Sequence, residues 1–185
     1  MMTEISLNIL DVVQNSICAG ADRIVISVKA DTKKDRLYII ISDNGSGMDA
    51  DQLEKVEDPF FTTRTTRKVG LGVPFFKYSA ESTGGRFEIN SELGTGTILN
   101  AEFVISHIDR MPLGDMTSTM HLLITSNCAI DFIYTYEIDG REFCLDTTKL
   151  REILEGVPFS EPEVSDFIRE YLAENKKEAD NGRYI

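Results

Sequence analysis

The stretch that decides the fold is Arg36-Leu-Tyr-Ile-Ile-Ile-Ser-Asp43-Asn-Gly45-Ser-Gly47. Its alternation predicts a strand with Leu37, Ile39 and Ile41 on one face. Asp43 continues this apolar face, where a carboxylate is costly unless hydrogen-bond donors meet it. The amino group of an adenine ring would be one such donor, and Gly45 and Gly47 would let the backbone approach a flat ring closely. An ordinary strand-ending turn is the alternative interpretation.

Hydrophobic periodicity on both sides of this strand predicts the other elements of the first segment. They are a helix over 4–19, strands over 23–30 and 36–42, a short helix over 51–56, a helix over 73–82, and a hairpin of strands over 86–91 and 97–105. The residues over 62–72 have few apolar anchors and predict a mobile loop. We therefore expect an α/β fold, an α+β two-layer sandwich with a mixed, mostly antiparallel sheet and helices on one face.

A second segment begins where the strand pattern ends, near Pro112 and Gly114. It predicts a helix capped by Asp115, a hairpin across Asp139-Gly140, and two further helices over 147–154 and 163–172, with a frayed end over the last ten residues. We therefore divide the chain into a domain over 1–106 and a small α+β C-terminal appendage over 107–185. Nothing in the sequence of the appendage assigns it a role.

The charge excludes some partners. The chain has 185 residues and a formal net charge of −12; residues 1–106 contribute −4 and residues 107–185 contribute −8. Duplex nucleic acid and anionic membranes select for clustered Lys and Arg, so this balance argues against both. It does not argue against a nucleotide, which a few backbone amides and one metal ion can hold.

The sequence also bears on the compartment. No apolar run approaches the roughly 20 residues of a membrane span, and no signal-peptide pattern opens the chain. Cys18, Cys128 and Cys144 are too widely spaced for a metal knuckle or a disulfide framework. We therefore expect a cytoplasmic protein with three reduced, mostly buried thiols.

Two polar residues on the first predicted helix are candidates for chemistry. Asp11 and Asn15 are four residues apart and so share one face of that helix. Asn15 could offer its amide oxygen to Mg²⁺, and Asp11 could orient or deprotonate an attacking hydroxyl. A solvated helix edge is the alternative for this pair.

Two further glycine clusters follow, Gly70-Leu71-Gly72 and Gly94-Thr-Gly96-Thr97. The first runs into a helix, whose free N–H groups could meet phosphate oxygens. Arg64, Arg67 and Lys68 precede it and suggest anion handling, although a solvated charged loop is the alternative. The hydroxyl of Thr97 could reach the edge of a base.

Taken in order, these blocks resemble the ATPase superfamily of gyrase, the heat-shock chaperone, histidine kinases and mismatch-repair ATPases. The matching boxes are Asp11-Val-Val-Gln-Asn15-Ser16, Asp43-Asn-Gly45-Ser-Gly47, Asp58-Pro-Phe-Phe-Thr-Thr-Arg64, and Gly70-Leu-Gly72 with Gly94-Thr-Gly96-Thr97. The likeness covers roughly residues 5–105. Parts of the sequence are similar to the stand-alone anti-sigma serine kinases and to ATPases encoded near iron-hydrogenase subunits.

The resemblance implies a histidine-kinase-like ATPase fold with ATP and Mg²⁺ as ligands. Asn15 would hold Mg²⁺, Asp43 would accept the adenine amino group, and the loop over 62–72 would be the ATP lid. Gly45, Gly47, Gly70 and Gly72, with Leu71, would frame the nucleotide. Two departures bear on catalysis more than on binding: Asp11 stands where the family usually has Glu, and Ala19 stands where histidine kinases often have a basic residue.

The resulting expectation is a regulatory protein in which ATP or ADP binding and lid closure are coupled to binding or phosphorylating a partner protein. The alternatives are a histidine kinase with an unusual acceptor at His107 and a catalytically degenerate nucleotide-sensing scaffold. His121 falls on an apolar helix face and is expected to be packed. A homodimer is one oligomeric state that the sequence allows.

Overall fold

The computed structural model describes residues 3–56, 72–183 and 185. The elements in chain order are α1 (Ile5–Cys18), β1 (Arg23–Asp31), β2 (Arg36–Asp43), α2 (Ala50–Lys55), α3 (Gly72–Glu81), β3 (Arg86–Glu92), β4 (Gly96–Val104), α4 (Met116–Ser126), β5 (Asp131–Ile138), β6 (Arg141–Asp146), α5 (Thr147–Ile153) and α6 (Pro162–Asp180). Every element that the sequence predicts is present, and most begin and end within two residues of the expected positions.

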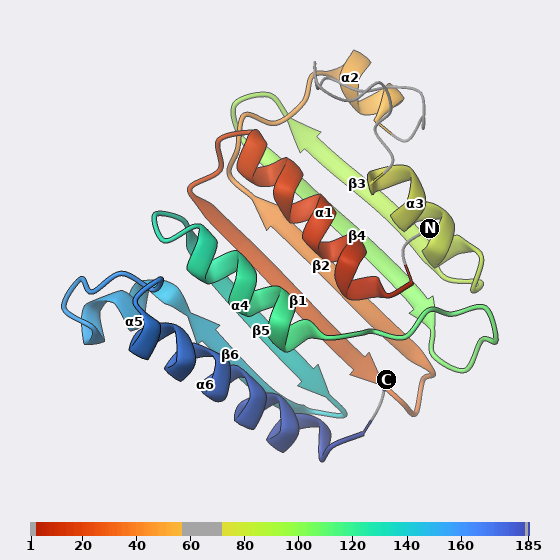
Figure 1. Ribbon diagram of the computed structural model, residues 1–185. Coiled ribbons are helices and arrows are strands. Elements are labelled where there is room, and N and C mark those ends of the chain that lie inside the picture. Colours follow the sequence, from red (N-terminus) through yellow and green to blue (C-terminus); the bar gives the residue numbers. More distant parts are fainter. Residues whose placement is uncertain (1–2, 57–71, 184) are drawn as a thin grey trace.

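The strands form one six-stranded sheet in the order β3-β4-β2-β1-β5-β6. Four of the five neighbouring pairs are antiparallel, and β1 with β5 is the parallel one. Helices α1, α3, α4 and α6 lie side by side over one face of this sheet (Figure 1). The predicted two-layer sandwich with a mixed, mostly antiparallel sheet is therefore confirmed.

The C-terminal segment continues the sheet of the first segment. Its strand β5 pairs with β1 from Arg23 opposite Asp131 to Ala30 opposite Ile138, and β6 then forms the sheet edge. The predicted hairpin turn lies at Asp139-Gly140, where both residues have positive φ. The division of domains at residue 106 stays a prediction, but the two segments share one sheet and one helical layer.

The core lies between the sheet and the helices. On β1 and β2 alternate side chains are buried, and the buried residues of α1 recur at helical spacing against them. The fully buried members from these three elements are Ile5, Ile9, Val13, Ile24, Ile26, Val28, Leu37 and Ile39. This packing fixes α1 above β2, which is what positions the site described below.

The end of the chain differs from the frayed tail that the sequence predicts. Helix α6 continues to Asp180, whose buried carboxylate accepts hydrogen bonds from the hydroxyl of Tyr136 (3.2 Å) and the ammonium of Lys176 (2.6 Å). Burial beside this carboxylate raises the pKa of Tyr136. The backbone N–H of Leu113 also donates to the carbonyl of Ile185 (3.0 Å). The prediction of a frayed end was wrong because Tyr136 on β5 and Leu113, both distant in the sequence, hold the end of the chain in place.

Helices α4 and α6 meet at His121. Its Nε2 lies 2.8 Å from the hydroxyl and 3.1 Å from the carbonyl of Ser165 on α6. Burial, together with the charge of Arg169, lowers the pKa of His121. The prediction that this histidine is packed is confirmed.

The expectation that the three cysteines are mostly buried was wrong, whereas the expectation that they are not disulfide-bonded agrees with the structure. Cys18 and Cys144 are exposed and Cys128 is partly buried, and all three are free thiols. Cys18 lies at the end of α1, and Cys144 lies on the edge strand β6, where alternate side chains point away from the helices. Among the described residues, no helix combines the length and the apolar character needed to cross a bilayer.

Asn8 on α1 is fully buried, and neither its amide oxygen nor its amide nitrogen has a hydrogen-bond partner among the described residues. A buried polar group without a partner costs about 1–3 kcal/mol. We expect Asn8→Leu, which keeps the side-chain shape, to raise the free energy of unfolding by about 1 kcal/mol in chemical denaturation. The matched variant Asn8→Asp should lower it, and a loss of stability in both variants would contradict the prediction.

Candidate functional site

Asp43 is the last residue of β2 and lies on the face of the sheet that α1 covers. Ile39 and Ile41 on the same face are buried. The hydroxyl of Ser16 on α1 donates to Oδ2 of Asp43 (2.6 Å), and the backbone N–H of Gly45 donates to Oδ1 (2.9 Å). The carboxylate therefore has the hydrogen-bond donors that its position on the apolar face led us to expect. Each of its oxygens keeps a lone pair for a further donor.

Two hydroxyl residues lie beside Asp43 on the neighbouring strands. Thr97 on β4 is the register partner of both Asp43 on β2 and Ser91 on β3. Directly opposed side chains point to the same face of a sheet, so these three line one row at the end of the sheet. The hydroxyls of Ser91 and Thr97 are 2.9 Å apart, and the hydroxyl of Ser91 also donates to the carbonyl of Gly96 (2.8 Å).

The glycines after Asp43 are required by close backbone packing. A Cβ on Gly45 would lie 3.0 Å from the Cβ of Ala19, at the end of α1. Gly47 has φ of +64°, and a Cβ there would overlap the carbonyl of Glu92 in the β3–β4 turn. Between them, the N–H of Ser46 donates to the carbonyl of Ala19 (2.9 Å). The loop is therefore held between α1 and the hairpin.

Asn44 anchors this loop to the start of β1. Its Oδ1 accepts hydrogen bonds from the backbone N–H groups of Asp22 (3.1 Å) and Arg23 (3.0 Å), and its Nδ2 donates to the carboxylate of Asp22 (2.6 Å). These bonds occupy both polar atoms of the Asn44 side chain, which therefore stabilises the turn. They leave Asp43 as the side chain that the strand end presents to a ligand.

Asp11 and Asn15 on α1 face the start of α3. Gly72 is the first residue of α3, and a Cβ on it would overlap the carboxylate of Asp11 and lie 3.7 Å from Nδ2 of Asn15. The structure therefore brings Gly72 together with Asp11 and Asn15, which belong to a different box of the sequence. A side chain at position 72 would displace the carboxylate of Asp11.

Several predicted ligand contacts lie outside the described residues. They are Arg64, Lys68, Gly70 and Leu71, together with Arg67 and the rest of the predicted lid over 62–71. Their positions relative to Asp11 and Asn15 stay predictions.

Ser16 is a site residue that the sequence analysis did not single out, although it stands next to Asn15. Ser16 is buried on the stripe of α1 that also carries Ile9 and Val12, and this position is what directs its hydroxyl to Asp43. The available signal was a hydroxyl residue at a core position of an otherwise apolar helix stripe.

His107 lies far from this site. It follows Val104, the last residue of β4, which pairs with Arg36 at the opposite end of β2 from Asp43. Seven residues of strand at roughly 3.3 Å each separate the two ends of β2 by about 23 Å. His107 sits in a turn, with Nδ1 accepting from the N–H of Asp109 (3.2 Å). This geometry disfavours phosphate transfer to His107 from a nucleotide held by the same copy.

The donor set at this end of the sheet fits a nucleotide with one magnesium ion. The described residues contain no group of three His, Cys, Asp or Glu side chains that could cage a metal. Mg²⁺ commonly binds through one or two protein oxygens and completes its shell with phosphate oxygens and waters. The amide of Asn15 beside the carboxylate of Asp11, in space kept open by Gly72, matches that mode.

Comparisons with known proteins identify the family that the chain resembles. Residues 2–107 match the family described as histidine kinase-, DNA gyrase B- and HSP90-like ATPase. The chain is 30% identical over 113 residues to the sensor histidine kinase ZraS of Escherichia coli, covering 61% of this chain and 23% of that protein. It is 35% identical over 105 residues to the sensor protein kinase FleS of Pseudomonas aeruginosa, covering 57% and 25%. The chain thus spans about a quarter of the length of these relatives.

A solved structure shares the fold. The N-terminal domain of a DNA repair protein superposes with a TM-score of 0.55 at 18% sequence identity, covering 78% of this chain and 53% of that one. The superposition extends beyond residues 2–107, so it includes part of the C-terminal segment. At this level of identity the likeness concerns the fold alone.

Proposed function

The chain belongs to the family of histidine kinase-, DNA gyrase B- and HSP90-like ATPases, and from this membership we propose that it is a Mg-ATP-binding regulatory protein. In this proposal, nucleotide binding and closure of the loop over 62–72 control whether the chain binds or phosphorylates a partner protein. The single observation that carries it is the carboxylate of Asp43, held at the sheet end by Ser16 and Gly45.

We assign Asp43 the role of binding the adenine ring. A carboxylate oxygen with a free lone pair accepts a hydrogen bond from the exocyclic amino group of adenine, which guanine cannot offer at that position. The bond from Ser16 fixes the orientation of the carboxylate before the base arrives. Thr97, the strand partner of Asp43, is assigned to the edge of the same base. This row therefore selects adenine nucleotides.

We assign Asn15 and Asp11 to the phosphate end of the nucleotide. Mg²⁺ held through the amide oxygen of Asn15 would neutralise charge on the phosphates. Asp11 lies one helical turn before Asn15 and beside Gly72, which supports assigning its carboxylate to orient or deprotonate a hydroxyl or water. Arg64 and Lys68 are assigned to phosphate oxygens, and Gly70, Leu71 and Gly72 to the backbone around them.

The test of regulation is capture of partner proteins. We expect immobilised wild-type chain to retain one set of proteins from a lysate of the source cells with Mg-ATP and to lose that set without nucleotide. Asn15→Ala should capture the same proteins in both conditions, because it cannot respond to Mg-ATP. Identical capture by the wild type with and without nucleotide would contradict the coupling of nucleotide binding to partner binding. It would favour a scaffold whose protein contacts do not depend on ATP.

A further inference from the structure

The outer side of α6 carries a strip of acidic and aromatic side chains. Residues three and four apart on a helix lie on one side of it, and this spacing connects the six members of the strip. We call it the α6 strip: Glu163, Phe167, Glu170, Tyr171, Glu174 and Glu178. Helix α6 lies at the edge of the helical layer, over the β5–β6 end of the sheet (Figure 1).

Packing of α6 on the core does not require the strip. The helix buries Ile168, Leu172 and Ala179 against the core. Phe167 and Tyr171 instead remain 48% and 38% exposed, with ring centroids 6.0 Å apart. Two neighbouring aromatic rings on the solvent side of a helix leave apolar surface in water, and covering that surface with a partner would be favourable.

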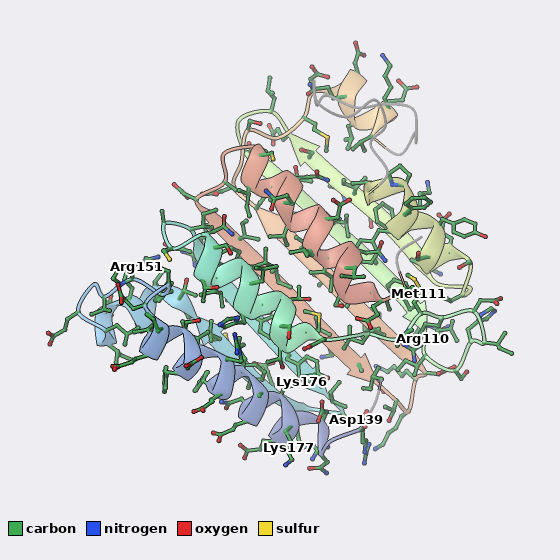
Figure 2. All side chains as sticks on the ribbon, viewed as in Figure 1. Arg110, Met111, Asp139, Arg151, Lys176 and Lys177 are labelled. Atoms are coloured by element: carbon green, nitrogen blue, oxygen red, sulfur yellow. The ribbon has the colours of Figure 1, made fainter. Side chains whose placement is uncertain are left out.

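The charge of the strip is not balanced within the molecule. In the part of the chain that the structure describes, none of its four glutamates forms an ion pair. Figure 2 shows Lys176 on the side of α6 toward α4 and Lys177 on the outer side. Lys176 is paired with the buried Asp180, so it does not neutralise the strip. Lys177 offsets one of the four glutamates, so the strip keeps an excess of negative charge that a basic partner would balance.

A shallow open hollow continues the strip toward the end of α6. It has a volume of about 530 Å³ and is lined by Glu174, Lys177, Glu178 and Asn181. A side chain from a partner could enter this hollow while its neighbours contact the rings. The strip thus offers apolar contact, negative charge and a recess along one helix side.

We propose that the α6 strip is a docking surface for a basic, arginine- and lysine-bearing segment of another protein. Guanidinium groups stack on exposed rings and pair with carboxylates at the same time, which matches rings interleaved with glutamates. A second copy of this chain would bring like charges together, and anionic membranes or nucleic acid would be repelled. The strip lies away from Asp43, so the proposal does not depend on ATP binding.

The test measures binding of a fluorescent amphipathic peptide of arginine, lysine and leucine to the full chain at physiological salt. We expect the wild type to bind it, and a peptide with glutamate in place of the basic residues to be rejected. Phe167→Ala with Tyr171→Ala, and Glu170→Lys with Glu174→Lys, should each weaken binding about tenfold or more. Both pairs are exposed, so the variants should keep the fold, which circular dichroism checks.

The matched control is Glu88→Lys with Glu92→Lys, two exposed glutamates on β3 at the opposite edge of the sheet. This variant changes the net charge equally and should bind the peptide within about twofold of the wild type. Absence of wild-type binding, or an equal loss in the control, would overturn the proposal. So would self-association of the wild type that the aromatic variant abolishes. Asp43→Ala should leave peptide binding unchanged, which separates this proposal from the nucleotide site.

Discussion

Replacing Asp43 with alanine is expected to weaken ATP binding strongly. The substitution removes the acceptor for the adenine amino group and also leaves the hydroxyl of Ser16 and the N–H of Gly45 without their partner. A hydrogen bond to a charged group contributes about 1.5–3 kcal/mol, so affinity should fall about 10- to 150-fold. Competition against a fluorescent adenine nucleotide measures the loss.

The same account predicts base selectivity. Wild-type protein should prefer ATP over GTP by a similar factor, because guanine presents a carbonyl oxygen where adenine presents its amino group. Asp31→Ala is the control and should keep the wild-type affinity for ATP. The carboxylate of Asp31 lies at the other end of the sheet, where it accepts a hydrogen bond from the N–H of Lys34 in the adjoining turn. Retention of ATP affinity by a folded Asp43→Ala protein would contradict the assignment of the adenine site.

Replacing Asn15 with alanine is expected to remove the magnesium dependence of nucleotide binding. Wild-type affinity for ATP should fall about tenfold or more when Mg²⁺ is chelated, whereas Asn15→Ala should bind equally weakly with and without the metal. Titration of ATP at fixed and at chelated Mg²⁺ measures the difference.

Asp11→Asn is the contrasting variant on the same face of α1. It keeps the shape beside Gly72 and removes the base, so binding should stay within about threefold while ATP turnover falls about 100-fold or more. Equal magnesium dependence in wild type and Asn15→Ala would contradict the role of Asn15. Unchanged turnover in Asp11→Asn would contradict the role of Asp11.

The local elements of this fold were predictable because their side chains carry the period of each structure. Alternation at Leu37, Ile39 and Ile41 predicts both the strand β2 and the face on which Asp43 lies. What the pattern cannot supply is which strands pair. The parallel pairing of β1 with β5 joins residues more than a hundred positions apart, and no local signal records it.

The tail and the site were harder to predict for the same reason. The end of α6 reads as a charged, frayed segment, yet Asp180 is buried and accepts a hydrogen bond from Tyr136 on the distant strand β5, besides one from Lys176 a turn earlier on α6. Asn8 reads as a polar break in an apolar stretch, and its burial follows from the position of α1 in the helical layer. Ser16 likewise becomes a site residue only once α1 lies above β2.

The net charge of −12 is unevenly distributed over the folded chain. Residues 107–185 contribute −8 of it, and four of those carboxylates gather on the α6 strip. The proposed nucleotide site lies at the end of the sheet near Asp43, whereas the proposed docking surface lies on helix α6, over the β5–β6 edge of the sheet. A partner seated on α6 would leave the end of the sheet near Asp43 open.

Calorimetric titration of the wild-type chain with ATP, in the presence and absence of Mg²⁺, tests most directly whether the chain binds Mg-ATP. We expect a single saturable site whose affinity depends on Mg²⁺ and is strongly weakened in Asp43→Ala. A folded wild-type protein that binds neither ATP nor ADP in the presence of Mg²⁺ would contradict it.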